Sequence, residues 1–258
     1  MRESVHIVRT AIVTGASSGI GKATAVRLAQ ERVNVTVVGR SKPELEKTAH
    51  LIRETGSEVL IASADLSKEI EVRECVKKAA AHFGRIDILV NAAGIIGTGT
   101  VETTTLESWD VMLNINLRSV FHLIQCAVPH LEKTKGAIVN VSSVTGVRAF
   151  PGVLAYCVSK AGVDQLTRCT ALELAEKGIR VNAVNPGVVL TNLHKRGGMN
   201  EKTYEAFTEH SKKTHPLGRI GKPEEVAELI AFLATSKSSW ITGTTISIDG
   251  GRAQTCAR

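Results

Sequence analysis

Short runs of β-branched and other apolar residues alternate along this chain with longer stretches in which apolar positions recur at helical spacing. Seven runs are expected to be strands: residues 10–14, 33–39, 58–64, 86–90, 137–141, 179–184 and 244–248. Six helices are expected between them, counted from their capping residues: 20–31, 41–55, 67–84, 104–131, 155–177 and 223–234. Strands that alternate with helices in this order predict an α/β protein with a doubly wound, seven-stranded parallel sheet flanked by helices.

Polar residues mark where three of these helices begin. Ser41 precedes a proline and a glutamate in the first turn, and Ser67 and Thr104 stand at similar N-cap positions, with Glu107 three residues after Thr104. Residues 187–222 are expected to be irregular and partly helical. No linker, repeat or low-complexity stretch divides the sequence, so residues 1–258 are expected to form a single domain.

The composition is that of a folded protein, with 43% hydrophobic and 22% charged residues in a chain of 258. No apolar run reaches the roughly 18–20 residues that a bilayer-spanning helix needs. The first ten residues carry charges where a signal peptide would be hydrophobic. We therefore expect no membrane partner and a cytoplasmic location, with an organelle still open.

Cysteine usage and charge argue against two further classes of site. The five cysteines, at 75, 126, 157, 169 and 256, are odd in number and never spaced as C-x-x-C, which favours reduced thiols over disulfides or a zinc site. The eight histidines include no H-E-x-x-H pair, so no metal is expected. The net charge is +7, but Lys and Arg are mixed with Asp and Glu and only 3% of residues are aromatic, so nucleic acid is not an expected partner.

A glycine-rich turn joins the first expected strand to the first helix, with the sequence Thr-Gly-Ala-Ser-Ser-Gly-Ile-Gly at 14–21. Glycines let the backbone approach a pyrophosphate, and the helix N-terminus supplies unpaired N–H groups and a partial positive charge. The spacing is G-x-x-x-G-x-G, and Thr24 stands where the common G-x-G-x-x-G pattern has its last glycine. Any tight turn between a strand and a helix could also use these glycines.

The second expected strand ends at Gly39, Arg40 and Ser41 without the acidic residue that would bind the ribose hydroxyls of NAD. The planar guanidinium of Arg40 suits a 2′-phosphate instead, which favours NADP(H) and leaves NAD(H) possible. The alternative is that Arg40 is simply a solvated loop residue.

Tyr156 and Lys160 are four residues apart in an expected helix, so their side chains project from one surface. A nearby ammonium favours the phenolate and is expected to lower the phenol pKa from its ordinary value near 10. Ser142 and Ser143 end the preceding expected strand. Taken alone, the tyrosine and lysine could be an ordinary pair on a helix surface.

These motifs together resemble the classical short-chain dehydrogenases/reductases, a Rossmann-fold family, over about residues 11–251. Besides the glycine-rich turn, the matching segments are SADLS around Asp65, NAAG at 91–94, NINL around Asn116, VNVSSVTG around Ser143, YCVSK at 156–160 and NPG at 185–187. The order of the segments makes the resemblance specific, and it implies hydride transfer between a nicotinamide cofactor and a carbonyl or alcohol substrate.

The resemblance also implies roles for particular side chains. Tyr156 would be the general acid or base, and Lys160 would lower its pKa and hold the nicotinamide ribose. Ser143 would hydrogen-bond the substrate oxygen, and Asn116 would maintain a helix distortion and a water-linked proton path to the lysine. The implied cofactor contacts are Gly15, Ser17, Ser18, Gly19, Ile20, Gly21, Arg40, Ser41, Asp65, Leu66, Asn91, Ala92, Gly94, Tyr156, Lys160, Pro186, Gly187, Val189 and Thr191.

Several of these residues also have ordinary structural explanations. Asp65 and Thr191 could be helix caps, Asn91 a hydrogen-bonding residue at a strand end, and Gly94 a turn former. Two positions depart from the family pattern: Ala92 replaces the second asparagine of N-N-A-G, and Ser18 stands where many NADP-preferring members have a basic residue. Arg40 is therefore expected to be the main phosphate partner.

The substrate side is expected to consist of residues 144–154 and a lid at about 193–216. Residues 193–222 contain seven Lys and Arg and three Glu, and the net charge of +4 could attract an anionic thioester or simply solvate a helix. Arg148 could be a substrate anchor or a surface cation. The resemblance is to 3-oxoacyl-thioester and broad carbonyl reductases, and a homotetramer is expected through helices 105–131 and 155–177 and the terminal strand.

Three readings of function remain open from the sequence. The first is NADP(H)-dependent carbonyl reduction, and the second is an NAD-dependent alcohol or hydroxysteroid dehydrogenase, which would use the same residues. The third is a non-catalytic cofactor-binding scaffold, which the presence of Ser143, Tyr156 and Lys160 disfavours. An enoyl reductase of this superfamily would separate the tyrosine and lysine differently.

Overall fold

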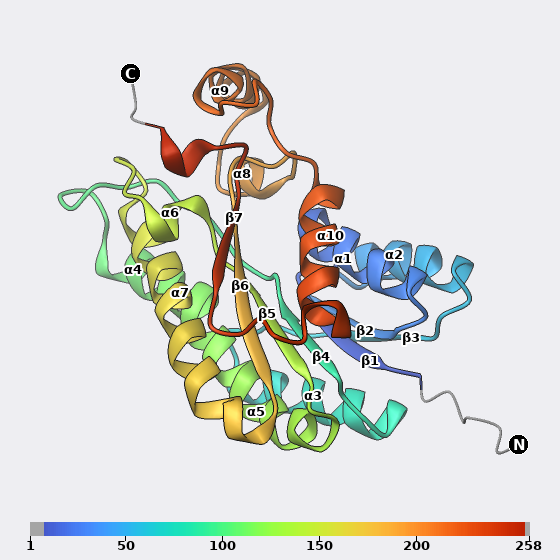
Figure 1. Ribbon diagram of the computed structural model, residues 1–258. Helices are drawn as coiled ribbons and strands as arrows, with labels where there is room; N and C mark the ends of the chain where they lie inside the picture. Colours follow the sequence, from blue (N-terminus) through green and yellow to red (C-terminus); the bar gives the residue numbers. More distant parts are fainter. Residues whose placement is uncertain (1–7, 256–258) are drawn as a thin grey trace, which may run out of the picture.

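The computed structural model describes residues 8–255, and Cys256 lies outside this range. One parallel sheet runs through the molecule with the strand order β3-β2-β1-β4-β5-β6-β7 (Figure 1). Its strands are β1 (Thr10–Thr14), β2 (Asn34–Gly39), β3 (Val59–Ser63), β4 (Ile88–Asn91), β5 (Ala137–Val141), β6 (Arg180–Pro186) and β7 (Thr245–Ile248). The predicted fold class, a doubly wound seven-stranded parallel sheet of Rossmann type, is confirmed.

Helices cover both faces of this sheet (Figure 1). They are α1 (Gly19–Gln30), α2 (Lys42–Glu54), α3 (Glu69–Phe83), α4 (Leu106–Leu113), α5 (Ser119–Thr134), α6 (Val144–Val147), α7 (Leu154–Leu174), α8 (Leu193–Arg196), α9 (Glu201–Thr214) and α10 (Pro223–Ala234). The apolar sides of α1, α2 and α10 share one core cluster, and those of α3, α5 and α7 share the other.

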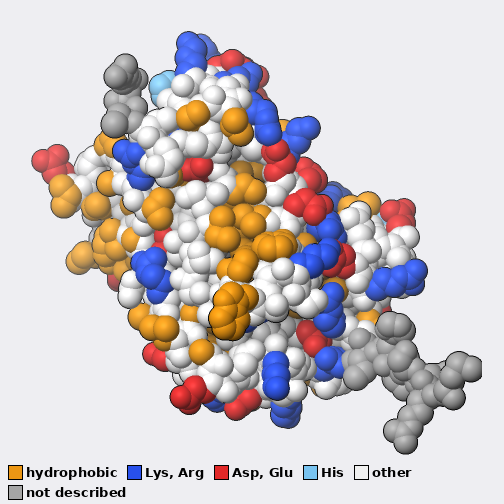
Figure 2. Space-filling view, in the orientation of Figure 1, with side chains coloured by type: hydrophobic (Ala, Val, Ile, Leu, Met, Phe, Trp, Pro, Cys, Tyr) orange, Lys and Arg blue, Asp and Glu red, His pale blue; other side chains and the backbone are white. Residues whose placement is uncertain are grey.

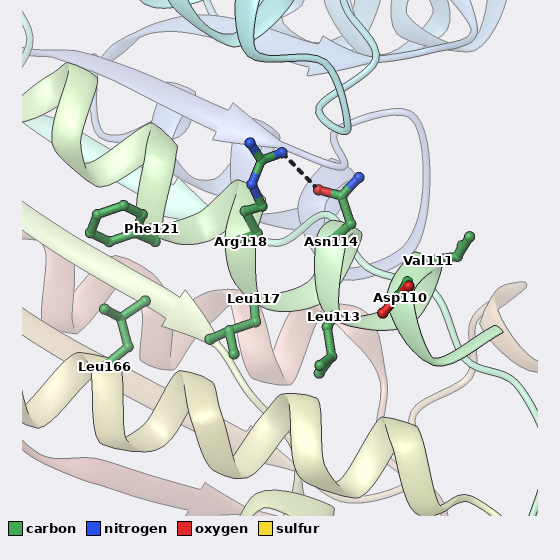
Figure 3. Close-up of a pocket in the computed structure, with 8 residues that line it drawn as sticks. All are labelled: Asp110, Val111, Leu113, Asn114, Leu117, Arg118, Phe121 and Leu166. Atoms are coloured by element: carbon green, nitrogen blue, oxygen red, sulfur yellow. Dashed lines mark hydrogen bonds between the residues drawn. The ribbon is translucent and has the colours of Figure 1, made fainter. Parts of the chain in front are cut away.

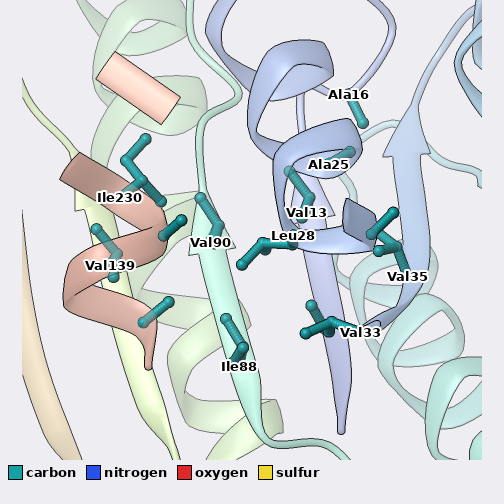
Figure 4. Packing of buried hydrophobic residues seen from close by; sticks show 14 of the residues in the cluster. Val13, Ala16, Ala25, Leu28, Val33, Val35, Ile88, Val90, Val139 and Ile230 are labelled. Atoms are coloured by element: carbon teal, nitrogen blue, oxygen red, sulfur yellow. The ribbon is translucent and has the colours of Figure 1, made fainter. Parts of the chain in front are cut away.

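The two cores follow from the alternation of side chains along each strand. Val13 and Val139 point into the cluster with α1 and α10, whereas Ile12 and Ile138 point into the cluster with α3 and α5. Figure 4 shows part of the first cluster, where Leu28 of α1 and side chains of α10 meet the strands. Because strands buried on both faces need apolar residues at every position, their sequences are almost continuously hydrophobic.

The N-cap residues of α3 and α4 each lie one residue later in the sequence than predicted. Thr105 caps α4, because its hydroxyl accepts the backbone N–H three residues on at 3.1 Å, while the Thr104 hydroxyl is buried without a partner among the described residues. Ser67 does not cap α3, because its hydroxyl donates to Asp65 at 2.8 Å. Ser41 occupies the predicted N-cap position of α2 but makes no capping hydrogen bond.

The helix predicted over residues 104–131 is broken into two. A π-helical turn, Asn114–Arg118, separates α4 from α5. Within the stretch Leu106–Thr134, an 18-residue window has a mean hydropathy of 1.3 and satisfies the length and composition of a membrane span, and 44% of that window is buried within the protein. Core helices of globular proteins meet the same criterion, so this finding is weak evidence for a membrane contact.

The carboxyl ends of the strands lie at one edge of the sheet, and α8 and α9 stand beyond that edge (Figure 1). The strand order reverses direction between the neighbouring strands β1 and β4. Ligands of open α/β sheets bind at such a point, outside the carboxyl ends of the strands. The segment 187–222, which was predicted to be irregular and partly helical, contains α8 and α9, and both helices lie within the expected lid at 193–216.

Candidate active site

The glycine-rich turn after β1 packs closely against the turn after β4. Gly15 has a φ of +66°, and a Cβ at this residue would lie 2.7 Å from the carbonyl oxygen of Ala92. Gly19 has a φ of +54°, and its Cβ would lie 3.0 Å from the Thr191 side chain. Both positions therefore require glycine for conformation and for space, and the backbone of the turn is exposed to the cleft between β1, β4 and the loop after β6.

The N-terminus of α1 is suited to an anionic group. Ser18 is its N-cap residue, yet the Ser18 side chain makes no capping hydrogen bond, and the first turn contains no acidic residue. The first N–H groups of the helix and its positive dipole end therefore have no side-chain anion. Ser17 lies at the end of β2, since its hydroxyl is 3.6 Å from where a Cβ of Gly39 would be. These residues fit a cofactor diphosphate.

Arg40 and Asp65 lie near each other beyond β2 and β3. The Arg40 side chain is exposed, and its backbone carbonyl accepts the Ser63 hydroxyl at 3.2 Å. Hydrogen bonds from the hydroxyl and N–H of Ser67 hold the pKa of Asp65 below its ordinary value, and Lys68 and Arg40 add to this effect. Asp65 is therefore an ionised acceptor, with Leu66 buried beside it and Ser41 exposed at the start of α2.

The end of β4 forms the floor of the cleft. Asn91 donates to Asn140 at 2.8 Å, and its own Oδ1 is buried without a partner among residues 8–255. The N–H of Ala92 donates to the hydroxyl of Thr14 at 3.0 Å, so the residue that replaces the usual asparagine is held by its backbone. A Cβ on Gly94 would lie 3.7 Å from Lys160 Nζ, which places this loop directly against the lysine.

Asn116 lies in the π-helical turn and is fully buried. Its Oδ1 accepts from the N–H of Ile95, and its Nδ2 donates to the carbonyl of Ile95, both at 2.9 Å. The same Nδ2 donates to Ser159 of α7 at 3.1 Å. Asn116 therefore ties the loop after β4 to α7, and the helix distortion expected at this residue is present.

Ser143, Tyr156 and Lys160 lie at the carboxyl end of β5 and in the first turns of α7, and all three are buried. Lys160 Nζ is 5.7 Å from the centre of the Tyr156 ring and donates to the carbonyl of Val141 at 2.8 Å. The Ser143 hydroxyl caps α6 by accepting from the N–H of Thr145 at 3.1 Å. The structure thus brings together the three side chains that the sequence singled out.

The pKa of Tyr156 moves in the opposite direction from the sequence prediction. Burial raises it to about 12, although a hydrogen bond with Ser143 opposes this shift. Burial also lowers the pKa of Lys160 to about 8, while Asp164 acts to raise it. Loss of solvation is the largest cause of the Tyr156 shift, and it outweighs the hydrogen bond with Ser143, so the phenol remains protonated at neutral pH.

The loop after β6 connects the sheet to α8 and α9, the region of the expected lid. Pro186 ends β6 and is buried, and Gly187 donates its N–H to Ile248 of β7 at 3.2 Å. Val189 is buried, and the hydroxyl of Tyr204 in α9 donates to the carbonyl of Thr191 at 3.2 Å. Of the expected cofactor residues of this loop, Thr191 therefore lies next to Gly19, whereas Val189 packs in the core.

His215 is a structural contact that sequence reasoning missed. Its buried ring accepts the N–H of Val188 at Nε2 at 3.1 Å, and its Nδ1 lies 2.6 Å from the carbonyl of Ser211. Nδ1 is therefore the protonated nitrogen. The ring fastens the end of α9 to the loop after β6, and a lone histidine without a motif gives no sequence signal for such a contact.

Arg148 makes contacts that the sequence did not indicate. Its Nη1 donates to the carbonyls of Ala253 at 2.7 Å and Thr255 at 2.6 Å, so it ties the substrate loop to the C-terminal segment. The guanidinium of Arg252 lies 5.1 Å from the centre of the Phe150 ring in the same loop. The described C-terminal segment therefore packs against the expected substrate loop, residues 144–154.

Ion pairs reduce the free charge on the lid. Lys195 pairs with Glu201 at 2.8 Å, Lys212 pairs with Glu209, and Arg219 pairs with Glu225 at 2.5 Å. Arg219 and the Lys222 N–H lower the pKa of Glu225 to about 2. Of the seven Lys and Arg in residues 193–222, four form no ion pair among the described residues: Arg196, Lys202, Lys213 and Lys222.

A groove of about 740 Å³ lies away from this site on the outer surface of α4, α5 and α7 (Figure 3). Its lining residues are Asp110, Val111, Leu113, Asn114, Leu117, Arg118, Phe121 and Leu166. None of them was predicted as a site residue.

Comparisons with known proteins agree with this arrangement. A family model described as enoyl-(acyl carrier protein) reductase matches residues 15–253. The 3-oxoacyl-[acyl-carrier-protein] reductase FabG of Thermotoga maritima is 42% identical over 244 residues, covering 94% of this chain and 97% of that protein. Glucose 1-dehydrogenase 2 of Bacillus subtilis is 37% identical over 247 residues, covering 94% of each.

Two solved structures are similar over almost the whole chain. A short-chain dehydrogenase/reductase of unknown function from Caenorhabditis elegans, solved with cofactor, has a TM-score of 0.90 at 38% identity and covers 96% of both chains. Carveol dehydrogenase from Mycobacterium avium in complex with NAD has a TM-score of 0.91 at 28% identity, covering 96% of this chain and 98% of that one.

Proposed function

The chain belongs to the short-chain dehydrogenase/reductase family of oxidoreductases, and from this premise we propose that it is an NADP(H)-dependent reductase of carbonyl substrates. Within that class we propose 3-oxoacyl thioesters as the leading substrates. The observation that carries the proposal is the buried cluster of Ser143, Tyr156 and Lys160 beside a glycine-rich turn suited to a dinucleotide.

The side chains of this cluster divide the work of carbonyl reduction. A bound nicotinamide supplies the hydride to the substrate carbon. Tyr156, whose pKa is raised to about 12, holds a proton at neutral pH and donates it to the oxygen, because the alkoxide formed is a stronger base than a phenolate. Ser143 donates a hydrogen bond to that oxygen as its negative charge develops. Lys160 stabilises the phenolate that remains.

The preference for NADP(H) rests on the end of β2. Arg40 is exposed there and no acidic residue follows the strand, so a 2′-phosphate would meet a guanidinium and not a carboxylate. Ser17 and Ser41 offer hydroxyls nearby, and Asp65 offers an ionised oxygen for the adenine side. Gly15, Ser18, Gly19, Ile20 and Gly21 would hold the diphosphate, and Asn91, Ala92, Gly94, Lys160, Gly187, Val189 and Thr191 the nicotinamide half.

Reduction of a C=O bond is favoured over reduction of a C=C bond by the spacing of the proton donors. Tyr156 and Lys160 lie one helical turn apart with Ser143 next to the phenol, so the polar groups converge on a single substrate oxygen. The same residues would serve alcohol oxidation, and glucose 1-dehydrogenase 2 of Bacillus subtilis is among the similar proteins. The cellular ratio of oxidised to reduced cofactor would then set the direction.

A homotetramer is part of the proposal. Apolar side chains are exposed on the outer faces of α4, α5 and α7, including Val111, Phe121 and Leu172. Figure 2 shows further apolar side chains gathered over β7 and beside α10, the region that contains the edge strand of the sheet. Exposed apolar patches of this kind are typical of protein interfaces, and a sedimentation experiment that finds only monomer would remove this part of the proposal.

A substrate panel tests the proposed function. Acetoacetyl thioesters, simple ketones and aldehydes are offered with NADPH and with NADH, and the loss of reduced nicotinamide is followed. We expect thioester reduction with NADPH, and Tyr156→Phe should lower kcat by about 100-fold or more because the proton donor is lost. Tyr204→Phe, at the other tyrosine, is the matched control and should lose less than about ten-fold. No turnover with any carbonyl would refute the assignment.

A further inference from the structure

Asp164 is a buried carboxyl group for which neither the family motifs nor the proposed chemistry gives a role. It lies in α7 one helical turn beyond Lys160 and is 1% exposed. Its Oδ2 accepts a hydrogen bond from Nδ2 of Asn185 at 2.8 Å. Its Oδ1 is buried and has no partner within residues 8–255.

Asn185 on β6 also has a buried side-chain oxygen that lacks a hydrogen-bond donor among the described residues. Its Nδ2 donates both to Asp164 and to the backbone carbonyl of Ser143, the latter at 2.9 Å. Reversing the amide would turn its oxygen toward two acceptors, so these bonds fix its orientation. The Oδ1 of Asn185 then faces no donor and is also buried without a partner in the described part of the chain. Two oxygens of one side-chain pair therefore lack a hydrogen.

We propose that Asp164 is a neutral carboxylic acid at neutral pH, paired with the Asn185 amide, and that it acts as a positioning residue for Ser143. One added proton on the carboxyl group supplies the donor that both orphaned oxygens lack. Within the pair, the acceptor for this proton is Asn185 Oδ1, which is also buried without a partner in the described part of the chain. Ser142 is a second neighbour, and it already gives its own hydrogen to the carbonyl of Lys160 at 3.1 Å.

The surroundings favour the neutral form. The elements packed against Asp164 face it with neutral groups: Ser142 at the end of β5, Gly146 in α6 and Asn185 on β6. The charged groups nearby are on its own helix, and both are directed elsewhere. Lys160 Nζ donates to the carbonyl of Val141, and Arg168 is exposed and donates to Gln165. Burial raises the pKa of Asp164, although hydrogen bonds with Ser142 and Asn185 and the charges of Arg168 and Lys160 oppose this shift.

A neutral pair has two consequences for the site. It joins α7 to β6 and, through the shared Asn185 Nδ2, to the backbone of Ser143, so it fixes where the Ser143 hydroxyl points. It also leaves the charge of Lys160 without a buried counter-ion. The positioning role rests on the proposed function, whereas the protonation state of Asp164 does not.

Infrared difference spectroscopy of the full chain tests the protonation state directly. The spectrum of the wild type minus Asp164→Asn at pH 7 is expected to contain the C=O stretch of a protonated carboxyl group, sensitive to exchange into D₂O. Glu225→Gln is the control, because Arg219 and the Lys222 N–H lower the pKa of Glu225 to about 2, so that side chain is a carboxylate at pH 7. Only carboxylate bands in the Asp164 difference spectrum would overturn the proposal.

The pH profile of kcat/KM tests the positioning role. Asparagine offers an N–H where the acid offers an O–H, so Asp164→Asn should lower kcat by less than about three-fold and leave the alkaline limb in place. Asp164→Leu removes the pair and should lower kcat by about ten-fold or more with little change in the Kd for NADPH. If Asp164 were ionised, Asp164→Asn would shift the alkaline limb to lower pH by about half a unit or more, because Lys160 would lose a counter-charge.

The two experiments separate the proposals from one another. A wild-type protein without reductase activity would refute the proposed function, and the infrared band would still decide the state of Asp164. Equal losses of kcat in Asp164→Asn and Asp164→Leu, in proteins of normal thermal stability, would reject the positioning role and leave the protonation state to the spectrum.

Discussion

The cofactor side and the substrate side of the cleft are built in different ways. On the cofactor side, backbone packs on backbone: a Cβ on Gly15 would lie 2.7 Å from the carbonyl of Ala92. On the proposed substrate side, a single side chain reaches across the chain, as Arg148 does to Ala253 and Thr255. A surface made of backbone tolerates almost no change at a few positions, whereas a surface held by side-chain contacts can be adjusted one contact at a time.

The largest effect should come from adding a Cβ at Gly15, on the proposed cofactor side, where backbone packs on backbone (the backbone-built side). Gly15→Ala should raise the Kd for NADPH by about 100-fold, because the residue has a φ of +66° and its Cβ would collide with the carbonyl of Ala92. Gly56→Ala is the matched control, since Gly56 has a φ of +83° but open space around its Cβ. Both variants should lose about 1 kcal/mol of unfolding free energy to the positive φ. Equal Kd values in a fluorescence titration would contradict the comparison.

A charge reversal on the same side should alter selectivity without breaking the cleft. Arg40→Asp should change the ratio of kcat/KM for NADPH over NADH by about 30-fold in favour of NADH, because a carboxylate repels a 2′-phosphate and accepts ribose hydroxyls. Steady-state kinetics with each cofactor measures this ratio. An unchanged ratio would mean that the phosphate is held by other residues.

On the substrate side, cutting one tether should affect the substrate alone. Arg148→Ala should raise the KM for the carbonyl substrate by about ten-fold, since two hydrogen bonds to the C-terminal segment are lost. The Kd for NADPH should stay within about two-fold, because the backbone-built side is untouched. Arg53→Ala, an exposed arginine of α2, is the control and should change neither value. Parallel losses of both affinities would mean that the two sides are not independent.

The smallest effect concerns pH. The pKa of Lys160 is lowered to about 8, so its ammonium is present below that pH and is lost as pH rises through it. Activity that depends on the charge should fall by about two-fold between pH 7 and pH 8 and by about ten-fold per unit further up. Binding of NADPH through Arg40 should not follow this limb. A profile that is flat to pH 10 would mean that bound cofactor restores the ordinary lysine pKa.

The sequence predicted the backbone-built side well because its requirements are local. A glycine-rich turn after a strand, an arginine at the next strand end, and a tyrosine and lysine one helical turn apart are all visible as residue patterns. The structure brings Ser143, Tyr156 and Lys160 together as the patterns required. The seven strands likewise follow from apolar runs that need no long-range information.

The remaining features depend on distance in space. The tether of Arg148 joins residues more than a hundred positions apart, and the ring of His215 meets Val188 only after α9 has folded back. The direction of the Tyr156 pKa shift could not be read from the spacing to Lys160, because it depends on how much water burial removes. Thr104 and Thr105 have the same capping chemistry, and the sequence does not show that the Thr105 hydroxyl caps the helix while the Thr104 hydroxyl lies beside Gly99.

Because of the π-helical turn at Asn114–Arg118, the direction in which the Asn116 side chain points depends on the number of residues in this segment. Such a turn accommodates one more residue than an α-helix would over the same rise, so a single deletion there could leave α4 and α5 as one regular helix. The sheet and its cores would survive, but Asn116 would rotate away from Ile95 and Ser159 by about a quarter of a turn. The shortened chain would keep its fold but lose the hydrogen bonds by which Asn116 ties the loop after β4 to α7, the helix that carries Lys160.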